Sequence, residues 1–334
     1  MVSSPWTEEW QEFAKTMGAP PVLPEDLELQ QAAANQIFTT LAGLQPPLPE
    51  TIISRRTDSD AEDMQIPNGP KVRVYRPGTT NEEPLPMIIF CHGGGWVAGN
   101  LDTEDRGCRI IASMTESWVV AVDYRCGMQV SLEEEVDDCY RAFEWARGRA
   151  RAHGADPDKM VVWGGSAGGS LAQAVVYRLV QEGKGSQVAG LALMCPVVLH
   201  PDATPEKYKH LNSSYTENAG PLPFISAADA YSIYERRDLA PPNTHINLFP
   251  VAGGPDAVRG FPPTYVVSSD NDATRDDCTV LAAVLKDAGV PVKHENIMGL
   301  AHYFWIFNLP MANRDFWSKL AKGILWTLMQ GRSA

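Results

Sequence analysis

One serine, Ser166, has surroundings that point directly to chemistry. It lies within Gly164-Gly-Ser-Ala-Gly168, which matches the pattern G-x-S-x-G. An apolar, β-branched stretch precedes the pattern and a run of small residues follows it, so we expect a strand, a sharp turn and a helix. Glycines permit a turn of that tightness. The turn would lift Ser166 Oγ above the sheet as a nucleophile; the alternative is a serine that only caps the helix.

A glycine run, His92-Gly-Gly-Gly-Trp96, follows the apolar stretch Met87–Cys91. Attack of a serine on an acyl group creates a negatively charged oxygen, which needs preorganised N–H donors. A run of glycines lets the backbone approach that oxygen closely, and the N–H of Ala167 would be the remaining donor. This pattern favours an oxyanion hole.

The same segment also fits a loose dinucleotide-binding fingerprint. Gly93-x-Gly95-x-x-Ala98 has the glycine spacing, and Asp123 ends the next strand where a ribose-binding acid would lie. That fingerprint opens its helix directly and normally follows the first strand of the fold. Here Gly99-Asn-Leu-Asp102 intervenes and the strand is an interior one, so the nucleotide interpretation is the weaker.

A serine nucleophile needs a base and an acid, expected in the chain order serine, acid, histidine. Of seven histidines, only His302 follows the last predicted strand. The acid belongs just after the strand Thr264–Ser269, where both Asp270 and Asp272 occur. Asp276 and Asp277 come later and suit the first turn of a helix, where the helix dipole favours carboxylates. No HExxH or EF-hand spacing is present, so we expect neither a metal nor a cofactor.

Apolar runs and helical periodicity alternate from residue 50 onward, which predicts a doubly wound α/β sheet. The predicted strands are Thr51–Arg56, Lys71–Tyr75, Met87–Cys91, Val119–Val122, Met160–Trp163, Val188–Met194, Thr264–Ser269 and Val292–Ile297. The predicted helices of this part are Thr103–Met114, Val136–Arg149, Ala167–Gln181, Asp276–Ala288 and about Asn313–Met329. Two amphipathic helices precede the sheet, and the stretch from His200 to Gly260 interrupts the alternation.

Composition narrows the class of protein. The 334 residues carry a net charge of −13, which disfavours binding to nucleic acids and anionic membranes. Six scattered cysteines without a CxxC pair are typical of a reducing compartment, and no apolar stretch is long enough to span a bilayer. We therefore expect a cytoplasmic protein whose partner is a small molecule; the oligomeric state stays open and includes a homodimer.

Together these segments resemble the hormone-sensitive lipase branch of the α/β-hydrolases, a family of microbial esterases and plant carboxylesterases. The matching segments are His92–Trp96, Gly99-Asn-Leu-Asp-Thr103, Asp123-Tyr-Arg125, Gly164–Gly169, Gly260-Phe-Pro-Pro-Thr-Tyr265, Asp272-x-x-Arg275-Asp276 and Gly299-x-x-His302. The resemblance implies an α/β-hydrolase fold: a mostly parallel central sheet flanked by helices, with a helical cap. Residues 1–48 and 201–255 would form the cap, and residues 49–200 and 256–334 the core.

The resemblance also implies the roles of individual residues. Ser166 would be the nucleophile, His302 the base and Asp272 the acid. The oxyanion donors would be Gly94, Gly95 and Ala167. The chain departs from the family at Cys126-Gly-Met-Gln129, at Gly165, where an acidic or small polar residue is common, and at Tyr303, where a glycine is common.

Three functions follow from these observations. The first is a serine carboxylester hydrolase that forms an acyl-enzyme with a small or medium acyl ester, such as an acylated specialised metabolite. The second is a lyase or cyclase that uses the same site to tailor a natural product. The third is a binding module, because the gibberellin receptor of plants shares this fold without a complete triad. The presence of Ser166, Asp272 and His302 together favours the enzymes.

Overall fold

The computed structural model describes residues 5–17, 27–45, 48, 61–78, 83–220, 222, 225–242 and 245–330. The predicted strand Thr51–Arg56 lies outside these residues. In the described part of the chain, no helix combines the length and the hydropathy that a membrane span requires.

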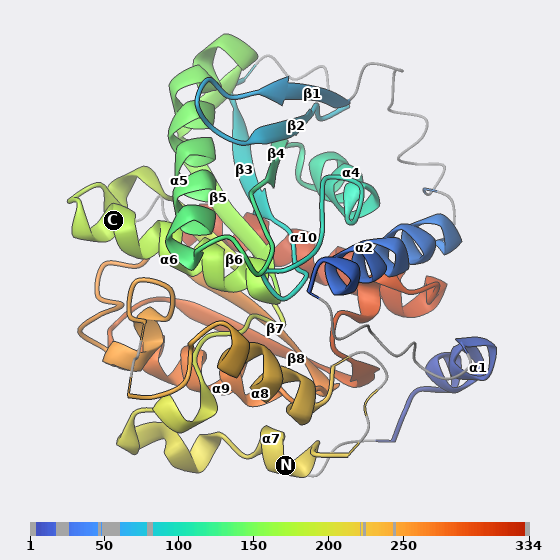
Figure 1. Ribbon diagram of the computed structural model, residues 1–334. Helices are drawn as coiled ribbons and strands as arrows, with labels where there is room; N and C mark the ends of the chain where they lie inside the picture. Colours follow the sequence, from blue (N-terminus) through green and yellow to red (C-terminus); the bar gives the residue numbers. More distant parts are fainter. Residues whose placement is uncertain are drawn as a thin grey trace.

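At the centre of the molecule, the described residues form a sheet of eight strands in the order β1-β2-β4-β3-β5-β6-β7-β8 (Figure 1). The strands are β1 Ala61–Gln65, β2 Lys71–Tyr75, β3 Leu85–Cys91, β4 Trp118–Asp123, β5 Ala155–Gly165, β6 Gly190–Met194, β7 Thr264–Asn271 and β8 Val292–Ala301. From β4 to β8 all neighbours are parallel, whereas β1 and β2 are antiparallel to their neighbours. The inner strands are buried on both faces, as their continuous apolar sequences predict.

Long helices cover both faces of the sheet. They are α4 Asp105–Thr115, α5 Leu132–Arg149, α6 Ala167–Gln181, α9 Arg275–Asp287 and α10 Pro310–Gln330. Alternate residues of β3 enter two separate cores: Ile89 packs with residues of α5, α6 and α9, and Ile88 packs with residues of α4 and α10. The predicted α/β architecture is confirmed.

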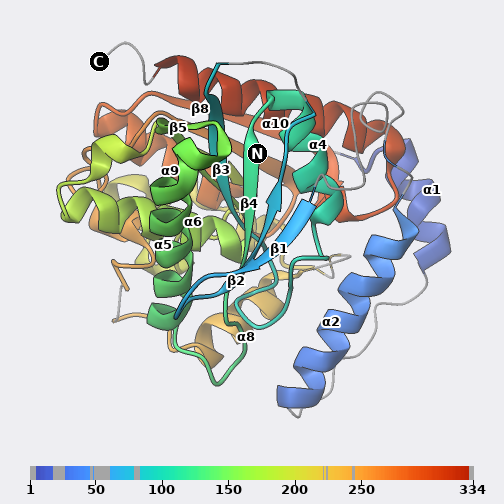
Figure 2. The same cartoon turned by 90° about the horizontal axis from the view of Figure 1, so that it is seen from above.

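The two N-terminal helices, α1 (Glu8–Met17) and α2 (Leu27–Leu44), pack on the face that carries α4 and α10. The ring of Trp10 lies edge to face with that of Phe307, with 5.5 Å between the centroids. Phe38 and Leu41 are buried in the same core. Both views show α1 and α2 on the side of the molecule away from α5 (Figures 1 and 2).

Between β6 and β7 lies the predicted interruption of the α/β alternation, residues 200–260, which we call the excursion. Its described part contains 3₁₀ turns and two short helices, α7 (Ser214–Glu217) and α8 (Ala227–Arg236). Helix α8 begins at a capping box in which Ser226 and Asp229 exchange side-chain to backbone hydrogen bonds. Tyr208, Tyr215 and Tyr234 are buried in the core that contains α5, α6 and α9. The excursion therefore packs against the body of the molecule rather than projecting from it.

Candidate active site

Ser166 occupies a sharp turn between β5, which ends at Gly165, and α6, which begins at Ala167. Its φ of 52° and ψ of −124° are strained for a residue with a side chain. The neighbours must be glycines: a Cβ on Gly164 would lie 2.2 Å from the carbonyl oxygen of Gly168, and a Cβ on Gly168 would lie 2.1 Å from that of Cys91. The sequence therefore forces Ser166 into the geometry of a nucleophile elbow.

His302 links Ser166 to a carboxylate. It follows the last residue of β8, and its Nε2 lies 2.8 Å from Ser166 Oγ. Its Nδ1 lies 2.7 Å from Asp272 Oδ2. Because a carboxylate accepts hydrogen bonds, Asp272 favours the tautomer with the proton on Nδ1, which leaves Nε2 able to accept the proton of Ser166. The structure thus brings the three predicted triad residues into one hydrogen-bonded chain.

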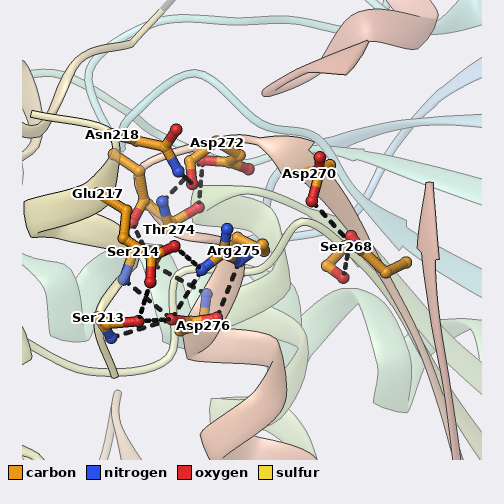
Figure 3. Close-up of polar contacts among 12 residues, drawn as sticks. Ser213, Ser214, Glu217, Asn218, Ser268, Asp270, Asp272, Thr274, Arg275 and Asp276 are labelled. Carbon is orange, nitrogen blue, oxygen red and sulfur yellow. Dashed lines mark hydrogen bonds and ion pairs between the residues drawn. The ribbon is translucent and has the colours of Figure 1, made fainter. Parts of the chain in front are cut away.

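The structure also separates the four candidate acids. Asp272 hydrogen-bonds to His302, whereas Asp270 Oδ1 accepts a bond of 3.3 Å from Asn296 Nδ2. Figure 3 shows Asp270 well apart from Asp272. Asp276 and Asp277 lie in the first turn of α9, as predicted. The hydrogen bond to His302 therefore points to Asp272 among these four.

The excursion holds the loop that carries Asp272 through hydrogen bonds that the sequence did not predict (Figure 3). Asn218 Nδ2 donates to the carbonyl oxygen of Asp272 at 3.0 Å, and Ser214 Oγ donates to that of Ala273 at 2.7 Å. The buried guanidinium of Arg275 pairs with Glu217 at 2.8 Å and with Asp276 at 2.9 Å. Asp272 and its loop are therefore held by residues of the excursion that lie more than fifty positions away in the sequence.

The glycine run after β3 forms a tight loop beside the turn that carries Ser166. Gly94 has a φ of 130°, and a Cβ there would lie 2.0 Å from the carbonyl oxygen of Ala98. Gly95 also has a positive φ, 64°. The start of this loop touches α6, because the carbonyl oxygen of His92 lies 2.2 Å from the position of a Cβ on Gly168. Burial lowers the pKa of His92 to about 4, so that its ring is neutral beside the loop.

The N-terminal helices and the excursion meet at the loop after β4, where the sequence departs from the family. Gln31 Nε2 of α2 donates to the carbonyl oxygen of Cys126 at 3.1 Å. Arg237, just after α8, donates to that of Gly127 at 2.9 Å. The N–H of Gly127 in turn donates to the carbonyl oxygen of Trp96, at 3.0 Å. One loop therefore joins both segments to the glycine run.

The described residues contain one group of metal-ligand type, Cys195, Asp272 and His302, whose ligand atoms lie within 4.8 Å of one another. Two of the three are hydrogen-bonded to each other in the triad. Burial raises the pKa of Cys195 well above its usual value, so its sulfur is a thiol at neutral pH. The nucleotide interpretation is also disfavoured, because the helix after Gly95 begins only at Asp105.

Comparisons with known proteins agree with this geometry. A family model described as an alpha/beta hydrolase fold matches residues 88–306. The chain is 32% identical to a versiconal hemiacetal acetate esterase of Dothistroma septosporum, over 98% of this chain and 97% of the relative. It is 31% identical to the carboxylesterase NlhH of Mycobacterium tuberculosis, over 85% and 84%.

Among solved structures, vibralactone cyclase superposes with a TM-score of 0.84 at 24% identity, over 99% of this chain and 97% of that one. At that identity the likeness shows the fold alone. Family model and esterase relatives together identify the activity class: the chain belongs to the α/β-hydrolase fold family, in its hormone-sensitive lipase-like branch, and is a serine hydrolase of the carboxylesterase type.

Proposed function

We propose that Ser166, His302 and Asp272 are the catalytic triad, and that the N–H groups of Gly94, Gly95 and Ala167 form the oxyanion hole. One observation carries this proposal, the continuous hydrogen-bonded chain from Ser166 Oγ through His302 to Asp272 Oδ2. Asp272 Oδ1 also accepts from the N–H of Thr274 at 2.7 Å and from its Oγ1 at 2.9 Å. These bonds orient the carboxylate toward the histidine.

In the proposed reaction, Ser166 Oγ attacks the acyl carbon of the ester while His302 Nε2 takes the hydroxyl proton. The oxyanion formed accepts hydrogen bonds from the three backbone N–H groups. The intermediate collapses to an acyl-enzyme, and His302 returns the proton to the departing alcohol. Water then repeats the sequence on the acyl-enzyme, releases the carboxylic acid and restores Ser166.

The proposed substrate is an ester of a short acyl group with a specialised metabolite. A fungal relative that matches nearly the whole chain is an esterase of a hemiacetal acetate. The surroundings of the site favour a small acyl group: Ser166 is only 7% exposed, and Ile233 of α8 lies 3.4 Å from the position of a Cβ on Gly95.

We also propose that residues 1–48 and 201–255 act as the cap. Their described parts bind the loops beside the site at Cys126 and Gly127, and Asn35 Oδ1 accepts from the N–H of Gly99 at 2.9 Å. The six free cysteines support a cytoplasmic location.

The test of the proposed function measures hydrolysis of p-nitrophenyl acetate and butyrate, with Ser166 as the expected site of labelling by a fluorophosphonate. Ser166→Ala should abolish labelling and lower kcat by roughly 10⁶-fold, because the triad acts as a unit. Residual activity above about a hundredth of the parent would overturn the assignment. Labelling of Ser166 without turnover would move the function to a lyase or cyclase.

A matched pair of variants tests the acid. Asp272→Asn should lower kcat by roughly 10⁴-fold, because an amide in place of the carboxylate favours the wrong tautomer of His302. Asp270→Asn makes the same chemical change two residues away and should leave kcat within about threefold of the parent. The reverse order of damage would assign the role to Asp270.

A further inference from the structure

A buried carboxyl group lies behind the glycine run and takes no part in the triad. Glu104 precedes α4 at the N-cap position, yet its side chain makes no capping bond and turns inward. It is 4% exposed, and none of the lysines, arginines and histidines in the described residues forms an ion pair with it. Its hydrogen-bond donors are two aromatic side chains and one backbone group. Trp305 Nε1 donates to Oε1 at 2.8 Å and the hydroxyl of Tyr303 donates to Oε2, while the N–H of Gly93 makes a longer bond of 3.4 Å to Oε2.

Tyr303 connects this carboxyl group to the glycine run. Its hydroxyl oxygen accepts a bond of 2.8 Å from the N–H of Gly93, the residue immediately before Gly94 and Gly95. Tyr303 is also the residue after His302, and its φ of 59° is the left-handed conformation, which turns its side chain back toward the loop. One tyrosine therefore couples the loop of the histidine to the loop of the oxyanion donors.

The tyrosine ring also fills the space between that loop and the nucleophile elbow. A Cβ on Gly93 would lie 2.4 Å from the hydroxyl oxygen of Tyr303, and a Cβ on Gly165 would lie 3.2 Å from its Cε2. Gly165 and Tyr303 are both departures from the family pattern, and a side chain at position 165 would meet the Tyr303 ring. The ring at position 303 occupies the side of the elbow on which a side chain at position 165 would lie.

We propose that Tyr303 and Glu104 are positioning residues for the oxyanion hole, which they align by holding the N–H of Gly93. This inference rests on the proposed function of Gly94 and Gly95. Three consecutive glycines have more backbone freedom than any other sequence, whereas donors of an oxyanion hole must be held within about 0.5 Å of their working positions. A buried hydrogen bond at the first glycine removes that freedom at the point where the loop begins.

The donor and acceptor directions of these hydrogen bonds define the role of each residue. Above its pKa of about 7, Glu104 is ionised and only accepts, so the Tyr303 hydroxyl donates to it and presents its oxygen to Gly93. Trp305 holds the other carboxylate oxygen and prevents the group from rotating. Glu104 thus orients Tyr303, and Tyr303 orients the loop.

The test is Tyr303→Phe, which keeps the ring and removes only the hydroxyl. We expect kcat to fall by about 10-fold, less than the 10²–10³-fold of a lost donor, because Gly94 and Gly95 remain but are less well aligned. KM should stay within about twofold. The inhibition constant of a trifluoromethyl ketone, whose adduct with Ser166 carries an oxyanion, should rise by the same factor as kcat/KM falls.

The matched control is Tyr75→Phe. Tyr75 is as buried as Tyr303, since each is 1% exposed. Its hydroxyl donates at 3.0 Å to Oδ1 of Asp105, the residue after Glu104. It makes no contact with the glycine run. This variant loses the same kind of bond and should lose stability, yet keep the kcat and the inhibition constant of the parent.

Titration with a fluorophosphonate counts the folded active sites, so that every kcat refers to competent enzyme. Equal kcat and inhibition constants in the Tyr303→Phe and Tyr75→Phe variants would overturn the proposal. If Tyr303→Phe does not fold, Glu104→Gln replaces it and should show the same fall in kcat with KM preserved; an unchanged kcat there would overturn the proposal as well. Failure of Ser166 labelling in the parent would instead overturn the proposed function itself.

Discussion

Burial of Glu104 makes the stability of this fold depend on pH in a direction opposite to that of a salt-bridged carboxylate. Loss of solvation raises the pKa of Glu104 from 4.5 to about 7, although its bonds to Tyr303, Trp305 and Gly93 act in the other direction. The folded state therefore binds a proton more tightly than the unfolded state. The stabilisation is fully present below pH 4.5 and is lost as the pH rises through 7.

The size of the effect follows from the two pKa values. A difference of one pKa unit corresponds to about 1.4 kcal/mol, so the complete loss amounts to about 3 kcal/mol. Between pH 5 and pH 8, integration of the linkage relation gives roughly 2.5 kcal/mol. Glu104 is almost completely buried, so solvent screening does not reduce this value. The ionisable groups that face it, Tyr303 and Cys108, have pKa values raised by burial and stay protonated throughout this range.

Urea unfolding of the parent and of Glu104→Gln at pH 5, 6, 7 and 8 measures this contribution. The glutamine does not titrate, so the difference in unfolding free energy between the two proteins isolates Glu104 from every other group. We expect the parent to lose roughly 2.5 kcal/mol relative to the variant between pH 5 and pH 8. A difference that stays constant with pH, or that moves in favour of the parent as the pH rises, would refute the reasoning.

Three further predictions concern the parts that hold the site. Arg275→Met leaves the buried Asp276 carboxylate without its cation and should lower the unfolding free energy by about 3–5 kcal/mol in urea; Arg259→Met, in an exposed pair, should change it by less than about 1 kcal/mol. Gly168→Ala places a Cβ against backbone and should yield no protein with a native near-ultraviolet circular dichroism spectrum. Deletion of residues 1–45 removes the hydrogen bond of Gln31 to the 126–130 loop and should lower kcat/KM at least 10-fold, while circular dichroism still shows a folded core.

The strands buried on both faces were predictable because continuous apolar runs are long enough to be recognised without alternation. Strand β1 was not predicted: Ala61–Gln65 is polar and, among the strands that the structure describes, lies at the sheet edge and pairs with β2 alone. Helix α5 begins four residues before the predicted Val136, at Leu132. Its start was legible in the sequence as a capping box, since Ser131 and Glu134 satisfy each other's backbone N–H groups.

The site was predictable to the extent that its signals are local. The glycines adjacent to Ser166 predict the turn, and His302 was predicted because it is the histidine that follows the last predicted strand. The choice of Asp272 over Asp270 needed the family pattern, because a difference of two positions at the end of a strand decides which way a side chain turns. The bonds of Glu104 to Tyr303 and of Asn218 to Asp272 join residues 199 and 54 positions apart, and no local pattern predicts such pairs.

The two apolar cores described above are unequal in their tryptophans. Of the nine in the chain, those on the face of α4 and α10 are Trp6, Trp10, Trp163, Trp305, Trp317 and Trp326, whereas Trp96, Trp118 and Trp145 belong to the other face. Intrinsic fluorescence is therefore an asymmetric probe of this enzyme. It reports mainly on the half of the molecule where the N-terminal helices pack, and events confined to the half that carries α5, α6 and α9 will change the fluorescence less, through three tryptophans rather than six.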